Sequence, residues 1–497
     1  MMTPIQKLSC LYIVTLLVAI TAIMTVLQFG SALTPPPAQS AASDHTLAAP
    51  PPAAVPAATA TEPVSAIAGV TKNLQANFHH PLSRLLVQLF VIIAVAQLAG
   101  RVCKRIGQPA VVGEIVTGIA LGPSLLGLIS PEAFAFVFPA DSLGALRLLS
   151  QVGVCLFMFG VGMELDVRQV QRNTHVAIAV SHLSIAFPYL LGVLLAYFLY
   201  SSLAGPSTTF TAFALFMGIS MSITAFPVLA RILQERGISR TFLGSTAMTC
   251  AAVDDVTAWT ILAFVVAVAG ATSLGSFSLN VLLVLAFITV MMLGVRRALP
   301  RLLGRDRLTR DEPSHGTLAV VVCVVIAASL STEVIGIHAL FGAFLAGAMM
   351  PDVDGFRRKI SDRVHAFSSV LLLPLFFAFT GLRTQIGLLH DVEGWSILLL
   401  ITLVATLGKL GGSAAAARFV GMPWAESLKL GALMNTRGLM ELIALNIGYD
   451  LGILSPRIFT MLVIMAVLTT MMTGPLLTLL RWQKPEIAED LPEPSRP

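Results

Sequence analysis

The chain has 497 residues, of which 56% are hydrophobic and only 11% are charged. Soluble domains carry about 25% charged residues, so this composition excludes an ordinary soluble protein. A net charge of +5 could suggest nucleic-acid binding, but the basic residues lie between long apolar runs, which favours a membrane protein without a nucleic-acid partner. The five cysteines are single, so neither a disulfide framework nor a zinc site is predicted.

The N-terminal region precedes the main apolar part of the chain. Residues 8–30 are apolar and uncharged, Lys7 stands before them and small residues follow, so residues 1–32 are predicted to be either a signal peptide or an N-terminal membrane anchor. Residues 33–81 are rich in Pro and Ala and contain few large apolar side chains, so we expect a disordered linker there. At the other end, residues 481–497 are predicted to form a short cytoplasmic tail.

Residues 82–480 contain repeated apolar runs of the length that crosses a bilayer, about 20 residues each. The fold class is therefore an all-α polytopic membrane protein. We predict thirteen transmembrane spans, near residues 82–100, 111–129, 143–163, 175–200, 209–230, 241–269, 275–295, 315–332, 336–351, 366–382, 394–417, 425–448 and 457–480.

The basic residues predict the orientation of these spans. Loops on one side hold 23 of the 31 Lys and Arg residues, whereas the opposite side, after the first span, holds only Arg147, Arg383 and Arg457. Cytoplasmic loops carry the excess of basic residues, so the first set is predicted to be cytoplasmic. This places the linker outside, a cytoplasmic loop at residues 296–310, an external loop at residues 201–208, and the C-terminus in the cytoplasm of a cell (inner) membrane.

The order of the spans indicates an internal repeat. Spans 1–6 and 8–13 form two sets of six, and their first members enter the membrane from opposite faces. The second span of each set is rich in small residues, and the fifth is polar in its middle, at residues 222–227 and 435–438. Interrupted segments at corresponding positions of two inverted halves are the best indication of a transporter's binding site in a sequence.

Asp254 and Asp255 lie in the middle of an apolar span. A carboxylate at membrane depth is unfavourable by a few kcal/mol or more, about +2.5 on insertion scales, so it should face protein or a water-filled cavity. Neighbouring residues on a helix point about 100° apart, which gives the two carboxylates different surroundings. The alternatives are a structural ion pair or a span boundary that places both residues in a loop.

Two further spans contain polar residues at membrane depth. Pro227 removes a backbone donor from its helix, and the oxygens freed there, with Ser222 and Thr224 beside them, suit a hard cation; an ordinary proline kink is the alternative. Lys409 either snorkels to the cytoplasmic interface or serves as a buried counter-ion of the acidic pair. From the spacing alone both readings of Lys409 stay open.

Arg437 and Glu441 stand four residues apart and share one helix face, which favours mutual neutralisation. Glu114 lies near the start of its span and could be a helix-end carboxylate. The sequence contains no nucleotide-binding loop, hydrolase elbow or dinucleotide fingerprint, and its histidines lack metal-ligand spacing. We therefore predict no enzyme activity, no cofactor and no metal site, and we expect an ion gradient to supply the energy for transport.

Six segments resemble, in the same order, motifs of the monovalent cation:proton antiporter-2 family, which includes Kef-type potassium/proton antiporters and plant-type cation/proton exchangers. The resemblance covers about residues 82–480. The segments are GEIVTGIALGPS at 113–124, SITAFPVLAR at 222–231, DD at 254–255, HALFGAFLAG at 338–347, PLFF at 374–377 and NTRGLMEL at 435–442.

The resemblance implies the sodium/proton exchanger fold, with two crossing broken helices, and a homodimer in the lipid bilayer. It implies that Asp255 binds cation or proton and that Asp254 forms a salt bridge with Lys409. The implied crossing includes Ser222, Thr224, Pro227, Asn435, Thr436, Arg437 and Glu441. The chain lacks the nucleotide-binding domain of Kef-type proteins and the long tail of the plant exchangers, so regulation by nucleotide or glutathione is not expected.

These patterns predict a secondary antiporter that exchanges K⁺ or Na⁺ for protons. The alternative is a gated cation channel or a potassium-sensing protein on the same fold. A channel requires a filter of carbonyls or charged rings, and no filter segment is visible in the sequence. An intramembrane aspartyl protease ranks last, because adjacent aspartates on one helix cannot converge on a shared proton.

Overall fold

A computed structural model describes residues 4–36, 77, 80–164, 174–238, 241–270, 274–304, 313–353 and 355–480. Every regular element in these ranges is a helix, apart from one isolated bridge between Ala204 and Leu454. The predicted linker at residues 33–81 lies mostly outside the described residues, and the predicted tail at residues 481–497 lies entirely outside them.

Within the described ranges, twelve helices or helix runs are long and apolar enough to cross a membrane. One of them is α1, and the other eleven match eleven of the predicted spans; the two remaining spans are the short helix α17 and the broken pair α21 and α22. Each of the thirteen predicted spans thus corresponds to a helix or a broken helix pair of the structure, and eleven of them are long and apolar enough to cross a membrane. The first helices are α1 Pro4–Gly30, α3 Pro81–Arg105, α4 Ala110–Leu121, α5 Leu126–Ile129, α6 Pro131–Val137, α7 Leu143–Glu164, α9 Thr174–Leu203, α10 Phe210–Ser222, α11 Phe226–Glu235 and α12 Phe242–Ala269. They are followed by α13 Leu274–Thr289, α14 Arg296–Leu303, α16 His315–Ile335, α17 Ala339–Ala348, α18 Phe356–Phe367, α19 Leu373–Arg383, α20 Val392–Phe419, α21 Trp424–Met434, α22 Leu439–Asp450 and α23 Pro456–Leu479.

Two helices extend further than the hydrophobic runs predicted. A π-helical stretch at Val290–Val295 joins α13 to α14, so the predicted loop at residues 296–310 begins as helix. Leu299 and Leu303 of α14 are each only 2% exposed, and their burial favours continuation of the helix despite the basic residues around them. Likewise, α18 carries the basic residues before α19, and a π-helical stretch at Ser368–Leu372 connects the two.

One set of helices, which we call the flanking group, consists of α3, α4, α7, α13, α14 and α16–α19. In it α4 packs against α3 and α19, whereas α17 packs against α16 and α7. The second span of each half thus contacts the first span of its own half and the third span of the other half, as inverted repeats require. Small residues permit these contacts: a methyl group on Gly118 would lie 2.2 Å from the carbonyl oxygen of Phe377.

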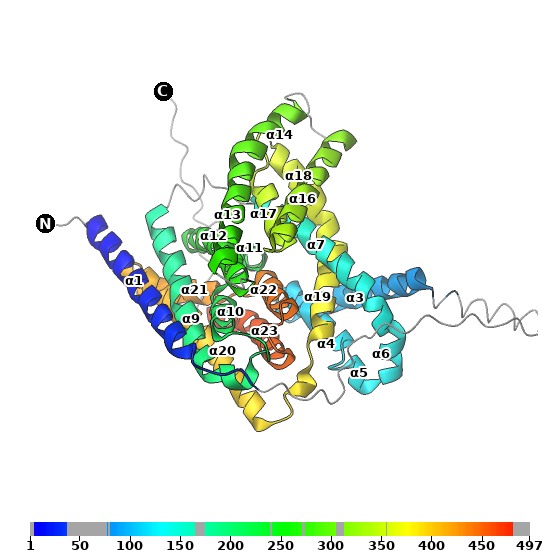
Figure 1. Cartoon of the computed structure of the whole chain (residues 1–497), viewed down its shortest axis with the longest axis horizontal. Helices are drawn as coiled ribbons and strands as arrows, with labels where there is room; N and C mark the ends of the chain where they lie inside the picture. Colours follow the sequence, from blue (N-terminus) through cyan, green and yellow to red (C-terminus); the bar gives the residue numbers. More distant parts are fainter. Residues whose placement is uncertain are drawn as a thin grey trace, which may run out of the picture.

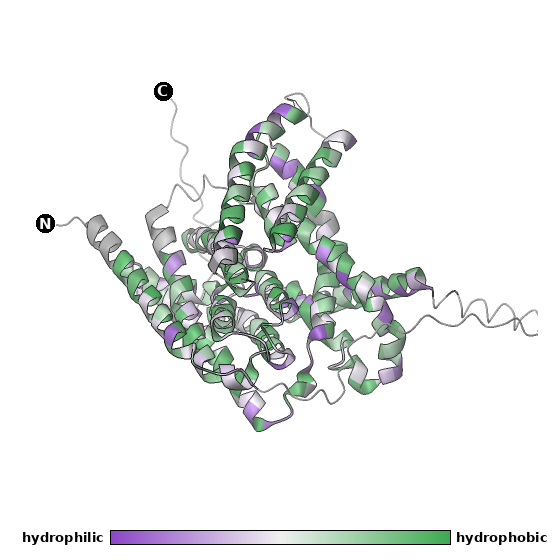
Figure 2. Cartoon of the chain, in the orientation of Figure 1, coloured by the Kyte–Doolittle hydropathy of each residue, from purple (hydrophilic) through white to green (hydrophobic). Residues whose placement is uncertain are grey.

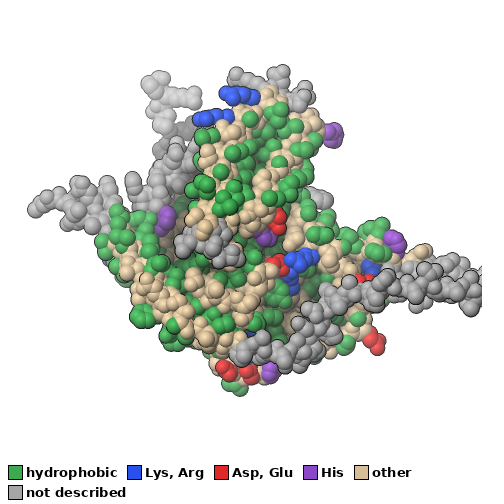
Figure 3. Space-filling model, viewed as in Figure 1, with side chains coloured by type: hydrophobic (Ala, Val, Ile, Leu, Met, Phe, Trp, Pro, Cys, Tyr) green, Lys and Arg blue, Asp and Glu red, His purple; other side chains and the backbone are tan. Residues whose placement is uncertain are grey.

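The remaining spans, which we call the crossing group, are α9–α12 and α20–α23. Here α9 packs against both α10 and α20, and α1 lies along α9 at the edge of the molecule (Figure 1). Whether residues 1–32 are an anchor or a signal peptide stays a prediction. Hydrophobic residues cover most helices of both groups (Figure 2), and they occupy much of the outer surface as well (Figure 3), as expected of a chain surrounded by lipid.

An aromatic cluster joins the two groups of helices. Trp259 of α12 meets the ring of Phe341 edge-on, with ring centroids 4.9 Å apart, and stacks near Phe344 at 6.0 Å. Both phenylalanines belong to α17 of the flanking group. Trp259 is 4% exposed and lies four residues after Asp255, so it occupies the same face of α12 as that carboxylate.

Candidate ion-binding site

Two helices of the crossing group are interrupted, and their interruptions meet. Residues 223–225 separate α10 from α11, and residues 435–438 separate α21 from α22. The backbone N–H of Ala225 donates to the carbonyl of Thr436 at 3.0 Å, which ties the two interruptions together. Pro227 lies in the first turn of α11, where backbone N–H groups have no acceptor within the helix. The lack of an N–H in proline therefore removes no hydrogen bond from this helix. Pro227 therefore begins a half-helix and does not kink a continuous one.

The interruption of α10 leaves its last carbonyl groups without intrahelical partners. Two buried cations supply donors: Arg437 donates to the carbonyls of Ser220 and Met221, each at 2.6 Å, and Lys409 donates to the carbonyl of Ser222, also at 2.6 Å. The C-terminal end of a helix carries partial negative charge, so both cations lie where the helix dipole favours them.

Asp254 lies at the centre of a fully buried hydrogen-bond network. Its carboxylate forms an ion pair with Lys409 at 2.7 Å, and it accepts hydrogen bonds from Ser181 at 2.5 Å and from Ser184 at 3.1 Å. The hydroxyl of Thr224 lies 2.9 Å from Asp254 and 3.0 Å from the carbonyl of Met434. One hydroxyl hydrogen serves only one of these acceptors at a time. Thr224 can therefore switch its hydrogen bond from the carboxylate of Asp254 to the carbonyl of Met434 at the end of α21.

Of the two readings of Lys409, the structure places this residue as a buried counter-ion. Its side chain is 0% exposed, and it does not reach an interface. The contact of Asp254 with Lys409 that the resemblance implied is therefore present. Asp255, the next residue of α12, is 1% exposed and points about 100° away from Asp254. Both aspartates lie inside α12, so neither is in a loop.

Arg437 and Glu441 form an ion pair at 3.1 Å within the membrane-spanning part of the crossing group, and both side chains are 0% exposed. The backbone of Arg437 is held by Thr470 of α23, whose hydroxyl lies 3.1 Å from its nitrogen and 2.7 Å from its oxygen. Asn435 and Thr436 contact the same helix through Thr469 and Thr473. The predicted neutralisation of Arg437 by Glu441 is present, together with hydrogen bonds that the sequence did not indicate.

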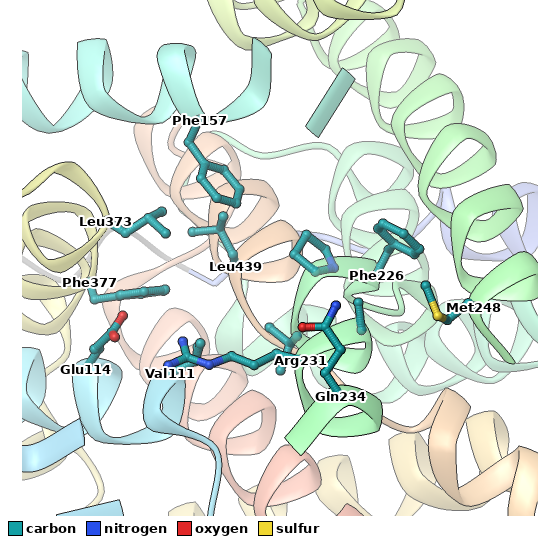
Figure 4. A pocket seen from close by; sticks show the side chains of 13 residues that line it. Val111, Glu114, Phe157, Phe226, Arg231, Gln234, Met248, Leu373, Phe377 and Leu439 are labelled. Atoms are coloured by element: carbon teal, nitrogen blue, oxygen red, sulfur yellow. The ribbon is translucent and has the colours of Figure 1, made fainter. Parts of the chain in front are cut away.

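A cavity of about 600 Å³ reaches the crossing from the end of α11. Pro227 and Leu439, one beside each interruption, are among the residues that line it. Glu114 and Arg231 approach each other across it from α4 and α11 (Figure 4). Glu114 is thus the fifth residue of α4 and lines a cavity, so its reading as a helix-end carboxylate is wrong. Asp255 is not among the residues that line this cavity.

Sequence reasoning missed Ser181 and Ser184. They stand three residues apart in α9, which puts both hydroxyls on one helix face, and that spacing in an apolar span was the available signal. In the described part of the chain, His, Cys, Asp and Glu residues nowhere form a group of three or more that could hold a metal ion.

Residues 90–482 match the family model described as sodium/hydrogen exchanger, transmembrane. The chain belongs to this exchanger family. The Na⁺/H⁺ antiporter NhaS4 of Synechocystis is 43% identical to this family member over 394 residues, which are 79% of the chain and 96% of NhaS4. Cation/H⁺ antiporter 17 of Arabidopsis thaliana is 39% identical and K⁺/H⁺ antiporter 1 of Saccharomyces cerevisiae is 30% identical, each over 80% of this chain.

The match covers 48% of the plant relative and 46% of the yeast relative, so this chain spans about half the length of each. Among solved structures, the sodium proton antiporter MjNhaP1 of Methanocaldococcus jannaschii superposes on 79% of this exchanger-family chain with a TM-score of 0.58. Their sequences are 12% identical, so the likeness supports the fold. The predicted sodium/proton exchanger fold is confirmed.

Proposed function

We propose that the chain is a secondary antiporter that exchanges a monovalent cation, Na⁺ or K⁺, for protons. The observation that carries the proposal is the crossing itself: a buried carboxylate pair lies beside two interrupted helices, and a cavity leads to them. The relatives' names, which include both Na⁺/H⁺ and K⁺/H⁺ antiporters, support the same exchange.

In this proposal Asp255 binds the transported ion. Asp254 is already paired with Lys409, whereas Asp255, the next residue of α12, is equally buried and lies on a different face of the helix. A carboxylate that binds either a cation or a proton, but not both, couples the two fluxes by competition. Thr224 and the carbonyl oxygens of the crossing would supply further oxygen ligands, which hard cations prefer.

The cavities favour an exchanger over a channel. The cavity at the α11 end has a volume of about 600 Å³, whereas the cavity at the far end of α22 has a volume of about 30 Å³. A channel needs a continuous pore, but an exchanger opens to one side at a time. The basic loops support placing the large cavity toward the cytoplasm.

We also propose a homodimer in the cell (inner) membrane with a cytoplasmic C-terminus. In the span Ser278–Leu303, the most apolar window has only 6% of its residues buried within one copy of the chain. This leaves an apolar helix face of the flanking group for a second copy and for lipid tails.

Replacing Asp255 with Asn tests the exchange function. The amide keeps the size of the side chain but cannot carry the negative charge, so proton flux driven by K⁺, Na⁺ or Li⁺ should fall to the level of vesicles without the protein. The measurement is fluorescence dequenching in everted vesicles at two pH values.

The control is Asp362→Asn, the same change at an exposed position of α18, which should leave flux unchanged. Wild-type flux in Asp255→Asn would disprove the role of Asp255. Cation current without obligate proton movement in the unmodified chain would instead indicate a channel.

A further inference from the structure

The side of the crossing opposite the large cavity is closed by an ion pair between the two groups of helices. Asp450, the last residue of α22, forms an ion pair with Arg383 of α19 at 2.7 Å. The same guanidinium donates to the side-chain oxygen of Asn446 at 2.9 Å, and Asn446 in turn donates to Thr380 at 2.8 Å. These contacts join α22 of the crossing group to α19 of the flanking group.

Arg383 is well enclosed in this position. Its side chain is 12% exposed, and its guanidinium lies 4.3 Å from the ring centroid of Phe379 and 5.1 Å from that of Tyr449. An enclosed guanidinium that contacts both a carboxylate and aromatic faces loses little to screening by solvent. The contact should therefore hold the two helices together firmly.

A second arginine supplies a matched comparison. Arg147 of α7 also pairs with Asp450, but at 3.3 Å and with 46% of its side chain exposed. Exposed ion pairs contribute little because water and salt screen them. Arg147 and Arg383 thus pair with the same carboxylate, but the ion pair of Arg147 is longer and exposed, whereas that of Arg383 is shorter and enclosed.

The ion pair is attached directly to the crossing. Helix α22 begins after Gly438 at the interruption and ends at Asp450, twelve residues later, so a single rigid helix of about 18 Å connects the two. Ile443, on the same helix, lines the cavity of about 30 Å³ that the ion pair covers, together with Asn446 and Asp450. Opening on this side requires α22 to separate from α19.

We propose that Arg383 and Asp450 form a latch that closes the route between the crossing and the face of the protein at which α22 ends. Arg383 acts as a positioning residue, which holds α22 against α19 while the opposite cavity is open and must release Asp450 before ions can leave on this side. The proposal rests on the proposed exchange function for its role in transport. Its geometry does not depend on which ion is carried.

The latch is tested by thiol labelling, which requires no transport. Ile443→Cys is introduced into a chain without its five natural cysteines, and a membrane-impermeant thiol reagent is applied to vesicles from the face at which α22 ends. Arg383→Gln should raise the labelling rate of the thiol about tenfold, because loss of the latch shifts the population toward the state open on this side. Arg147→Gln should change the rate less than about twofold.

A second reporter and two further variants complete the test. A thiol at Gln234→Cys, which lines the large cavity, should be labelled more slowly from the other face in Arg383→Gln. Arg383→Lys should restore part of the closure, and Asp450→Asn decides the question if Arg383→Gln does not reach the membrane. Unchanged labelling of Ile443→Cys in both Arg383→Gln and Asp450→Asn would overturn the latch, as would an equal effect of Arg147→Gln. Since flux is not measured, the latch can fail while the exchange function stands.

Discussion

The ammonium group of Lys409 contacts four oxygens that belong to three other helices. They are the carbonyl and hydroxyl oxygens of Ser184, the carbonyl of Ser222 and the carboxylate of Asp254. A buried ion pair is stable only when further hydrogen bonds satisfy both partners, and here α9, α10 and α12 provide them. Loss of the charge on Lys409 would leave Asp254 buried with its hydroxyl donors alone.

Replacing Lys409 with Gln tests whether this lysine carries a transported proton. If Lys409 and Asp255 each release one proton, each cation exchanges for more than one proton and transport is electrogenic. In proteoliposomes, wild-type exchange should then respond to an imposed membrane potential, and Lys409→Gln should lose that response. Breaking the buried pair should also lower the free energy of unfolding by about 3–5 kcal/mol.

Lys429→Gln, a change to another lysine of the crossing group, is the control for this experiment. It should leave the voltage response intact. A wild-type rate indifferent to potential, or a Lys409→Gln protein as voltage-sensitive as wild type, would rule out the proton-carrying role of Lys409.

The sequence allowed the charged residues of the site to be predicted, but not the two serines that contact them. Charged residues are so unfavourable in apolar spans that Asp254, Asp255, Lys409 and Arg437 could be identified from their positions within apolar runs. The spacing left the partner of Lys409 open, and the resemblance supplied it. Ser181 and Ser184 could not be predicted as site residues, because a serine in a membrane helix commonly bonds to the backbone of its own helix and is not unfavourable there.

At the scale of elements, the apolar runs predicted the helices and missed their extensions. Helices α14 and α18 lie in basic segments outside the apolar runs. Backbone hydrogen bonds and a few buried side chains stabilise these helices despite their basic residues. The break between α21 and α22 was visible as polar residues 435–438, and the break after α10 as residues 222–227. That the two breaks touch through Ala225 and Thr436 is a long-range contact, which periodicity cannot predict.

Helix α20, which carries Lys409, begins at an exposed cap. Asp391 accepts a hydrogen bond from the backbone of Gly394 at 3.1 Å and forms an ion pair with Arg457 of α23 at 2.7 Å. Partial desolvation raises the pKa of Asp391, but the hydrogen bonds from Arg457 and Gly394 outweigh it, so the pKa lies below its usual value. The cap therefore works best when Asp391 is ionised.

Replacing Asp391 with Asn tests this cap through pH. A carboxyl whose pKa is lowered on folding stabilises the protein above its unfolded pKa, about 3.9, and loses that effect as the pH falls through the folded pKa. Asp391→Asn should lower the melting temperature at about pH 6 and make little difference near pH 3. A difference in melting temperature that stays constant over this range would contradict the role of the charge.

At the scale of the whole molecule, the basic residues of the loops set the orientation. They predict that residues 296–310 face the cytoplasm and residues 201–208 the outside. Three spans lie between these segments in the described chain: α10 with α11, α12, and α13. An odd number of spans is what two segments on opposite sides of a membrane require. Membrane orientation depends on how the chain inserts, which helix packing alone does not reveal.

Single cysteines test the orientation directly. In a cysteine-free chain, Ser202→Cys should react with an impermeant thiol reagent only from outside the cell and Arg301→Cys only from the cytoplasmic side. Each residue lies at an end of its helix, so the substitutions leave the packed core intact. Labelling of both thiols from the same side would contradict the predicted topology.

The aromatic contact between α12 and α17 places an intrinsic fluorescent probe between the two groups of helices. Trp259 is an indole chromophore fixed on the helix that carries the aspartate pair, and it rests against two rings of the flanking group. Indole emission responds to water and to neighbouring rings. A displacement of one group of helices along the other should therefore change the emission wavelength and the fluorescence intensity of Trp259. In a chain whose other three tryptophans, Trp395, Trp424 and Trp482, are replaced, the emission of Trp259 would therefore report conformational exchange without an added label.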